Sequence, residues 1–221
     1  MFIFDYNHIA FTALGYDMSY LELIATIAGL IAVWLSAREH IWNWPIGLVN
    51  VVFSYVLFFK TGFYSDALLQ IYFFITGVYG WWLWSARDTQ TAESRVKIGF
   101  LTTKQQIYTG FFIVIMAIIF GYLTNHLHGW YPSVFPVQAA FPYADSLVMM
   151  MSVVGNLLLT VKKIEAWILW VIVDIIAPFL YFQKGILLIT FEYVIFLILS
   201  IFALWNWLSI YKKQQIKIKI N

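Results

Sequence analysis

Polar side chains lie inside stretches of the sequence that are otherwise apolar and aromatic. In the segment 41–84, Asn50 interrupts one apolar run, and Asp66 and Gln70 lie four residues apart at the start of the next. A spacing of four places Asp66 and Gln70 on the same face of a helix. Because an unpaired polar side chain is costly in an apolar environment, these residues predict a polar binding site inside a helical membrane protein.

The C-terminal part of the chain contains a comparable group. Asn156 and Asp174 lie within apolar runs, and Glu192 and Tyr193 lie near the start of the last run. A buried carboxylate needs a partner or a proton, which favours a functional role for Asp174 and Glu192. Asparagine also forms hydrogen bonds between helices in membranes, so a structural role is an equally good interpretation of Asn50 and Asn156.

Most of the 11 tryptophans are expected at membrane interfaces or in packing. Trp44 and Trp167 are better candidates for a ligand contact, because each lies at the start of a short apolar run. An aromatic face can stack on a flat ring and attract a cation. A belt at one membrane interface is predicted from Trp42, Trp81, Trp82, Trp84, Trp205 and Trp207.

Composition indicates the class of protein that must hold these residues. Of the 221 residues, 62% are hydrophobic, 20% are aromatic and only 11% are charged. A soluble domain has roughly 25% charged residues, so this chain is predicted to be an all-α integral membrane protein surrounded by membrane lipids. The net charge of +2 does not suggest a nucleic-acid partner.

Motifs for other kinds of chemistry are missing from the sequence. The chain has no cysteine, which excludes disulfides and thiolate metal sites. His126 and His128 share one loop without a third ligand nearby, so no metal site is predicted. The sequence has no phosphate-binding loop, recognisable catalytic triad or ATP-binding motif. We therefore predict no cofactor and no enzymatic activity.

Apolar runs predict seven transmembrane helices, each with about the 17–25 residues that cross a bilayer. Their expected bounds are 20–37, 44–59, 64–84, 106–123, 143–161, 166–182 and 186–210. Capping boxes are predicted at Ser19 with Glu22 and at Thr103 with Gln106. The remaining segments are an extracytoplasmic segment 1–19 (1–18 as a short interfacial helix), a cytoplasmic loop and linker helix 85–125, and a basic cytoplasmic tail 211–221.

Lysine and arginine residues determine the expected orientation. With seven spans, only Lys60 and Lys184 fall on one side of the membrane, and the other 11 of the 13 basic residues fall on the opposite side. Basic residues favour the cytoplasmic side. The chain is therefore predicted to lie in a bacterial inner membrane with its N-terminus outside and its C-terminus in the cytoplasm.

An internal repeat relates the two ends of the chain. A shift of 123 residues aligns Tyr20 with Tyr143 and also pairs Glu22 with Asp145, Trp44 with Trp167, Phe59 with Phe182, Trp82 with Trp205 and Trp84 with Trp207. The shift defines a first three-helix repeat at 20–84 and a second at 143–210. Because one linker helix separates them, both repeats have the same orientation. We expect a 3+1+3 parallel pseudo-twofold arrangement, with a ligand pathway between the halves.

Several motifs resemble the PnuC family of bacterial vitamin transporters. They are WNWPIG at 42–47, Asn50, YSDALLQ at 64–70, YGWWLW at 79–84 and WILWVIVD at 167–174, and the resemblance covers about residues 19–210. It implies nicotinamide riboside uptake by facilitated diffusion, a fold similar to a SWEET sugar transporter, and a homotrimer. The family's binding cavity, carried onto this chain, implicates Trp44, Asn50, Asp66, Gln70, Asn156, Trp167, Asp174 and Tyr193.

The chemistry of nicotinamide riboside fits these residue types. Asparagine and glutamine can pair with its carboxamide, aromatic rings can stack on its pyridinium cation, and aspartate can accept from its ribose hydroxyls. Transport by alternating access would need no pump if a cytoplasmic kinase phosphorylates the product. Two alternatives stay open: a transporter of thiamin, riboflavin or a deoxynucleoside, and a membrane-embedded enzyme acting on a lipid.

Overall fold

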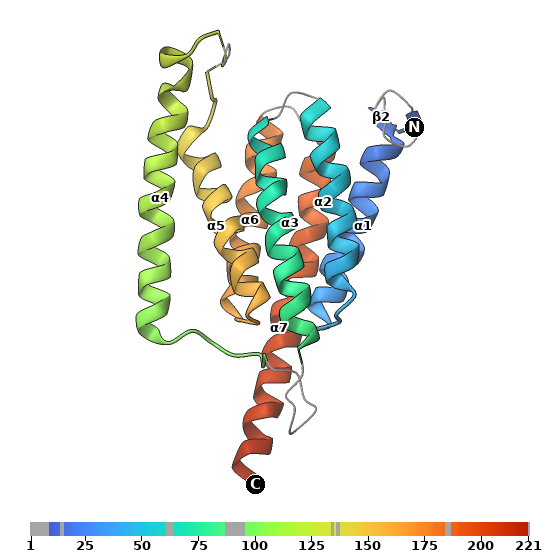
Figure 1. Cartoon of the computed structure of the whole chain (residues 1–221), viewed down its shortest axis with the longest axis vertical. Coiled ribbons are helices and arrows are strands. Elements are labelled where there is room, and N and C mark those ends of the chain that lie inside the picture. Colours follow the sequence, from blue (N-terminus) through green and yellow to red (C-terminus); the bar gives the residue numbers. More distant parts are fainter. Residues whose placement is uncertain are drawn as a thin grey trace. The chain divides into compact units, whose positions relative to one another are not determined.

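The computed structural model describes residues 9–13, 16–60, 64–86, 96–133, 135, 138–183 and 187–220. Within them the chain forms seven α-helices (Figure 1): α1 (Tyr20–Ala37), α2 (Asn43–Lys60), α3 (Tyr64–Ser85), α4 (Thr103–Trp130), α5 (Pro142–Thr160), α6 (Glu165–Gln183) and α7 (Leu187–Ile220). The chain divides into two compact units, Met1–Lys97 with α1 to α3 and Ile98–Asn221 with α4 to α7.

A β-hairpin precedes the first helix. Strands β1 (Ile9–Ala13) and β2 (Tyr16–Ser19) pair antiparallel, with Thr12 opposite Asp17 and a hydrogen bond from the Thr12 hydroxyl to the Asp17 carboxylate. The β-branched and aromatic side chains in this short segment favour a strand. The prediction of a short interfacial helix over 1–18 is therefore wrong for the strand residues.

Side-chain caps begin two of the helices. At α1, Ser19 Oγ accepts from the Glu22 amide and the Glu22 carboxylate accepts from the Ser19 amide, which confirms the predicted capping box. At α4 the box is formed by Thr102 and Gln105, one residue earlier than the predicted pair. The predicted pair was wrong because the Gln106 side chain binds a carboxylate of α6 instead.

Six of the described helices are long and apolar enough to cross a bilayer, namely α1, α3, α4, α5, α6 and α7. The other, α2, has 18 residues, or about 27 Å at 1.5 Å per residue, and carries Asn43, Asn50 and Lys60. The chain is therefore a multi-span, predominantly helical membrane protein. α4 continues to Trp130 and α7 to Ile220, so the predicted basic tail extends the last helix.

Within each unit, helices adjacent in sequence pack against each other. In the first unit α2 packs against both α1 and α3, and in the second unit α4 packs on α5, α5 on α6 and α6 on α7. Figure 1 shows α4 running alongside α5 over most of its length. The linker helix α4 therefore belongs to the second compact unit.

The local structure of the second unit repeats that of the first with the predicted shift of 123 residues. α1 and α5 end at Ala37 and Thr160, α2 and α6 end at Lys60 and Gln183, and α3 and α7 begin at Tyr64 and Leu187. Each of these pairs is 123 residues apart. α1 and α2 therefore match α5 and α6 in length to within one residue, whereas α7, with 34 residues, continues beyond the counterpart of α3, which has 22.

The corner between α1 and α2 and the corner between α5 and α6 share one backbone geometry. Glu39 and Lys162 occupy the same place in the two corners, with φ angles of 58° and 52°. Residues other than glycine rarely adopt this left-handed backbone conformation. In both corners the next amide donates to the carbonyl five residues earlier, at 2.9 Å. The same unusual turn therefore joins the first two helices of each repeat.

Candidate functional site

Trp44 and Trp167 lie near the starts of α2 and α6 and are buried, with exposed fractions of 5% and 2%. The Trp44 ring meets Trp84 of α3 edge-on, with ring centroids 5.3 Å apart and an interplanar angle of 89°. Trp167 meets Trp207 of α7 in the same way, at 5.7 Å and 82°. Edge-to-face pairs are favourable beyond the area that they bury. Each pair therefore fastens one helix to the next in its own unit.

These contacts correct part of the predicted interface belt. Trp84 is 6% exposed and Trp207 is fully buried, so both are packing residues and their assignment to the belt was wrong. Trp42, Trp82 and Trp205 are exposed by 60%, 61% and 67%, as residues of a belt facing lipid would be.

A glycine in α3 permits the close packing of Trp44. A β-carbon added at Gly80 would lie 2.4 Å from atoms of the Trp44 ring, which is shorter than any real contact. The indole nitrogens of Trp44 and Trp167 are buried and have no hydrogen-bond partner within the described part of the chain. Both rings are thus committed to the packing of their own units.

Asn50 is partly exposed in the middle of α2. Its Nδ2 donates to the carbonyl oxygen of Ala25 in α1 at 2.8 Å. This is an interhelical hydrogen bond of the kind that holds membrane helices together. A primary amide also carries a carbonyl acceptor, so the bond to Ala25 orients Asn50 and does not by itself exhaust its hydrogen-bonding capacity.

Asp174 lies in the middle of α6 and is 2% exposed. The hydroxyl of Ser200 in α7, which is also buried, donates to the Asp174 carboxylate at 2.6 Å. The corresponding positions of the first unit hold Val51 and Gly77, so the two units differ in chemistry here. Pro178, one turn later in α6, has no amide hydrogen for the Asp174 carbonyl, which weakens the helix at this point.

The other candidates occupy α3, α5 and α7. Gln70 is buried in α3, and the side chain of Asp66 lies outside the described residues. Asn156 in α5 and Tyr193 in α7 are partly exposed, and the Tyr193 ring stacks on Tyr181 of α6 with centroids 5.4 Å apart. Five of the candidates have contacts described above, and each contacts a residue that was not predicted to belong to the site. These contacts fix each candidate against a neighbouring helix and do not join the candidates to one another. The five are Trp44, Asn50, Trp167, Asp174 and Tyr193.

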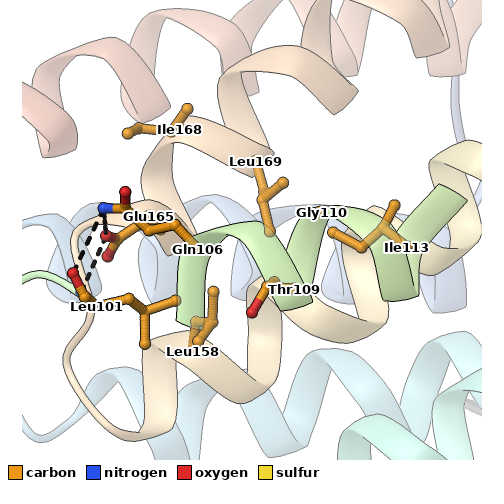
Figure 2. Close-up of a pocket in the computed structure, with 9 residues that line it drawn as sticks. All are labelled: Leu101, Gln106, Thr109, Gly110, Ile113, Leu158, Glu165, Ile168 and Leu169. Atoms are coloured by element: carbon orange, nitrogen blue, oxygen red, sulfur yellow. Dashed lines mark hydrogen bonds between the residues drawn. The ribbon is translucent and has the colours of Figure 1, made fainter. Parts of the chain in front are cut away.

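A cavity of about 140 Å³ lies between α4, α5 and α6 (Figure 2). Its lining is mainly apolar, and the polar lining residues are Gln106, Thr109 and Glu165. Pockets for drug-sized ligands measure about 300–1,000 Å³, so this cavity is too small for a nucleoside. Glu165 was missed by sequence reasoning, because a charged residue after Lys162 and Lys163 is typical of an exposed helix end.

Known proteins resemble the chain over most of its length. The profile of the family described as nicotinamide mononucleotide transporter matches residues 19–209. The nicotinamide riboside transporter PnuC of Escherichia coli (strain K12) is 32% identical over 219 residues, covering 91% of this chain and 90% of that protein. The riboflavin/roseoflavin transporter RibM of Streptomyces davaonensis is 23% identical over 203 residues, with coverage of 91% and 90%.

A solved structure has the same fold. The crystal structure of the vitamin B3 transporter PnuC matches with a TM-score of 0.63 and 22% sequence identity, covering 88% of this chain and 83% of that chain. The family profile begins at the cap of α1 and ends within α7, so it includes every helix described here. The chain belongs to the nicotinamide mononucleotide transporter (PnuC) family, whose members are membrane transporters and not enzymes.

Proposed function

We propose that this protein takes up nicotinamide riboside across the bacterial inner membrane by facilitated diffusion. The observation that carries the proposal is the similarity to the Escherichia coli nicotinamide riboside transporter, at 32% identity over about nine tenths of both chains. The polar and aromatic residues inside the helices supply the groups that this substrate needs: amides for its carboxamide, carboxylates for its hydroxyls and cation, and aromatic rings for stacking.

The distribution of charge favours a nucleoside over a nucleotide. None of the 13 lysine and arginine residues lies within the bounds of the seven predicted spans, whereas Asp66, Asp174 and Glu192 do. A phosphate group is normally held by arginine or lysine. Acidic side chains would repel the phosphate of nicotinamide mononucleotide and attract the pyridinium cation of nicotinamide riboside.

Eight residues contribute to substrate binding in this proposal, in two ways. Gln70 and Asp66 share a face of α3 and, with Asn50, Asn156 and Tyr193, contact the substrate. The buried residues Trp44, Trp167 and Asp174 shape the site from behind, because their contacts with Trp84, Trp207 and Ser200 fix the helices that carry the contact residues.

Transport would proceed by alternating access, in which the two three-helix repeats change their relative arrangement. We propose seven spans in a 3+1+3 parallel pseudo-twofold arrangement similar to a SWEET transporter, with α2 as the second span. The N-terminus would lie outside and the C-terminus in the cytoplasm, and the protein would form a homotrimer. Phosphorylation of the imported nicotinamide riboside by a cytoplasmic kinase would keep its free concentration in the cell low and so maintain the concentration gradient for uptake.

A second candidate function is transport of a different vitamin. The riboflavin/roseoflavin transporter RibM is also similar over 91% of this chain, although at only 23% identity. Thiamin carries a cationic ring, as nicotinamide riboside does, whereas riboflavin is uncharged. The acidic residues within the spans therefore favour nicotinamide riboside and thiamin over riboflavin.

Binding to the purified protein tests the substrate assignment. Isothermal titration should show binding of nicotinamide riboside, with weaker binding of nicotinamide mononucleotide, thiamin and riboflavin. Gln70→Ala and Asp66→Ala should each raise the Kd by about tenfold or more, because a polar ligand group would lose its partner. Thr76→Ala is the matched control in α3, since the Thr76 hydroxyl donates to backbone carbonyls of its own helix. Tighter binding of riboflavin, or unchanged binding in both variants, would refute the substrate or the site.

A further inference from the structure

The segment that leads into the linker helix is paired with a corner of the second repeat. The Gly99 amide donates to the Lys162 carbonyl at 3.1 Å, and the Ile164 amide donates to the Gly99 carbonyl at 3.0 Å. These two bonds form a parallel β-bridge between Gly99 and Lys163. The bridge fastens residues that lie more than 60 positions apart in sequence.

Glu165, at the start of α6, extends this pairing to the linker helix itself. Its Oε1 accepts from the Leu101 amide at 2.9 Å and from Nε2 of Gln106 at 2.7 Å. Figure 2 shows Leu101, Gln106 and Glu165 joined by these bonds at one end of the cavity. Gln106 is in the first turn of α4, so one carboxylate oxygen connects the linker segment, α4 and α6.

Two further contacts secure the same segment. Ile98 is buried, with 3% of its surface exposed, and so anchors the segment where it enters the second unit. The Phe100 ring meets Tyr211 of α7 edge-on, with centroids 5.2 Å apart. The segment is therefore tied to the α5–α6 corner, to α4 and to the extended end of α7.

We propose that residues 98–101 together with Glu165, which we name the linker clasp, stay closed throughout the transport cycle. The clasp makes α4 move with α5, α6 and α7 as one body. This inference rests on the proposed transport function. Glu165 is a positioning residue in it, because its contacts are with protein groups of the clasp. Rearrangement between the repeats then leaves the contacts of residues 98–101 with the second unit unchanged.

The reason for permanent closure is the cost of opening. Opening the clasp would break two backbone hydrogen bonds and two hydrogen bonds to the Glu165 carboxylate. Hydrogen bonds to a charged group are stronger than those between neutral groups. The second oxygen of Glu165, Oε2, is buried and has no hydrogen-bond partner within the described part of the chain. The hydrogen bonds at Oε1 therefore have to offset the cost of burying the Glu165 carboxyl group.

A disulfide across the β-bridge tests whether the clasp stays closed. The chain has no cysteine, so Gly99→Cys with Lys163→Cys gives one defined pair. Paired strands lie about 4.8 Å apart, which is within the range of Cα separations that a disulfide spans. A β-carbon at Gly99 would have only the end of the Lys163 side chain within 4 Å, so the position has room.

The double-cysteine protein should cross-link on oxidation and still transport nicotinamide riboside in liposomes. Its uptake rate should stay within about twofold of the rate of the reduced double-cysteine protein. Both forms lack the hydrogen bond from Lys163 Nζ to the Phe100 carbonyl, so the comparison isolates the effect of the disulfide. Each single-cysteine variant, treated with the same oxidant, is the control. Loss of uptake on oxidation, reversed by a reductant, would show that the clasp opens during transport. Failure to cross-link would show that it is not closed, and either result would overturn the proposal.

Glu165→Ala tests the central residue. It should lower the uptake rate about fivefold or more, because the Leu101 amide and Gln106 amide lose their acceptor. Oxidation of Gly99→Cys/Lys163→Cys in the Glu165→Ala background should restore uptake, since the disulfide replaces the lost bonds. If Glu165→Ala does not fold, Gln106→Ala removes one of the same bonds and takes its place. Wild-type uptake in Glu165→Ala, or no rescue by the disulfide, would contradict the role given to Glu165.

These experiments separate failure of the inference from failure of the proposed function. If the unmodified protein takes up no nicotinamide riboside, the proposed function is wrong, and cross-linking efficiency still reports whether the clasp is closed. If the unmodified protein transports and the cross-linked protein does not, the clasp proposal alone is wrong.

Discussion

Asp174 and Ser200 form a buried polar contact between two membrane helices, and both side chains are 2% exposed. A carboxylate in such a place depends on its hydrogen bond, because the alternative is a charge without a partner in an apolar environment. The first unit places Val51 and Gly77 at the corresponding positions and has no such requirement. The second unit therefore carries a polar contact at a place where apolar residues also suffice.

Removing one member of this pair should cost more than removing both. Ser200→Ala should lower the free energy of unfolding by about 1–3 kcal/mol, because it leaves the Asp174 carboxylate without its donor. Asp174→Val combined with Ser200→Ala should be closer to the unmodified protein, since an apolar pair replaces both partners. Thermal unfolding in detergent measures both variants. A double variant that is less stable than Ser200→Ala would contradict the interpretation.

Residue types inside the membrane could be predicted from sequence, but their partners could not. The sequence singled out Asp174 and Asn50 because polar residues in apolar runs are conspicuous. Nothing in it indicated that Asp174 would bind Ser200 or that Asn50 would bind the Ala25 carbonyl. Serine and a backbone carbonyl give no distinctive signal, and their proximity depends on how neighbouring helices pack.

At the scale of helices, matched tryptophan pairs fasten α2 to α3 and α6 to α7. Trp44 packs on Trp84 with Gly80 beneath its ring, and Trp167 packs on Trp207. Both pairs follow the shift of 123 residues, as do the C-terminal ends of the first two helices of each repeat and the left-handed corner residues. The repeat therefore extends from sequence to packing within each unit.

Replacing either Trp84 or Trp207, the buried partners of Trp44 and Trp167, should destabilise the protein strongly. Trp84→Ala and Trp207→Ala should each cost about 3–5 kcal/mol, the usual cost of removing a large buried aromatic side chain. Trp205→Ala is the matched control in α7, because Trp205 is 67% exposed and should change stability by about 0.5 kcal/mol or less. Chemical unfolding followed by circular dichroism compares the three. Equal losses for Trp205→Ala and Trp207→Ala would show that burial in the structure does not predict their energetic roles.

The positions of the helices were well predicted, and the errors have physical causes. α1 and α3 match their predicted bounds within a residue, because long apolar runs and the Ser19 cap are strong signals. The N-terminal hairpin was missed because a short mixed segment has no clear periodicity. Trp84 and Trp207 were assigned to the interface because a tryptophan at a helix end is typical of both a belt and a buried contact.

At the scale of the whole molecule, the chain combines a multi-span helical fold with acidic, amide and aromatic groups inside the spans predicted from the sequence, which contain no lysine or arginine. A neutral lipid-facing bundle would not need such groups, and a phosphate carrier would need basic ones. A small cationic nucleoside fits this combination. The family of the chain and the charge inside its spans therefore favour the same class of substrate.

The most direct measurement is uptake of radiolabelled nicotinamide riboside by liposomes that contain the purified protein and have no ion gradient and no nucleotide. Facilitated diffusion predicts uptake that saturates, stops at equal internal and external concentrations, and is accelerated by unlabelled nicotinamide riboside inside the vesicles. Empty liposomes and liposomes containing Gln70→Ala protein provide the background. Uptake that requires a proton or sodium gradient, or that does not exceed the background, would contradict the proposed function.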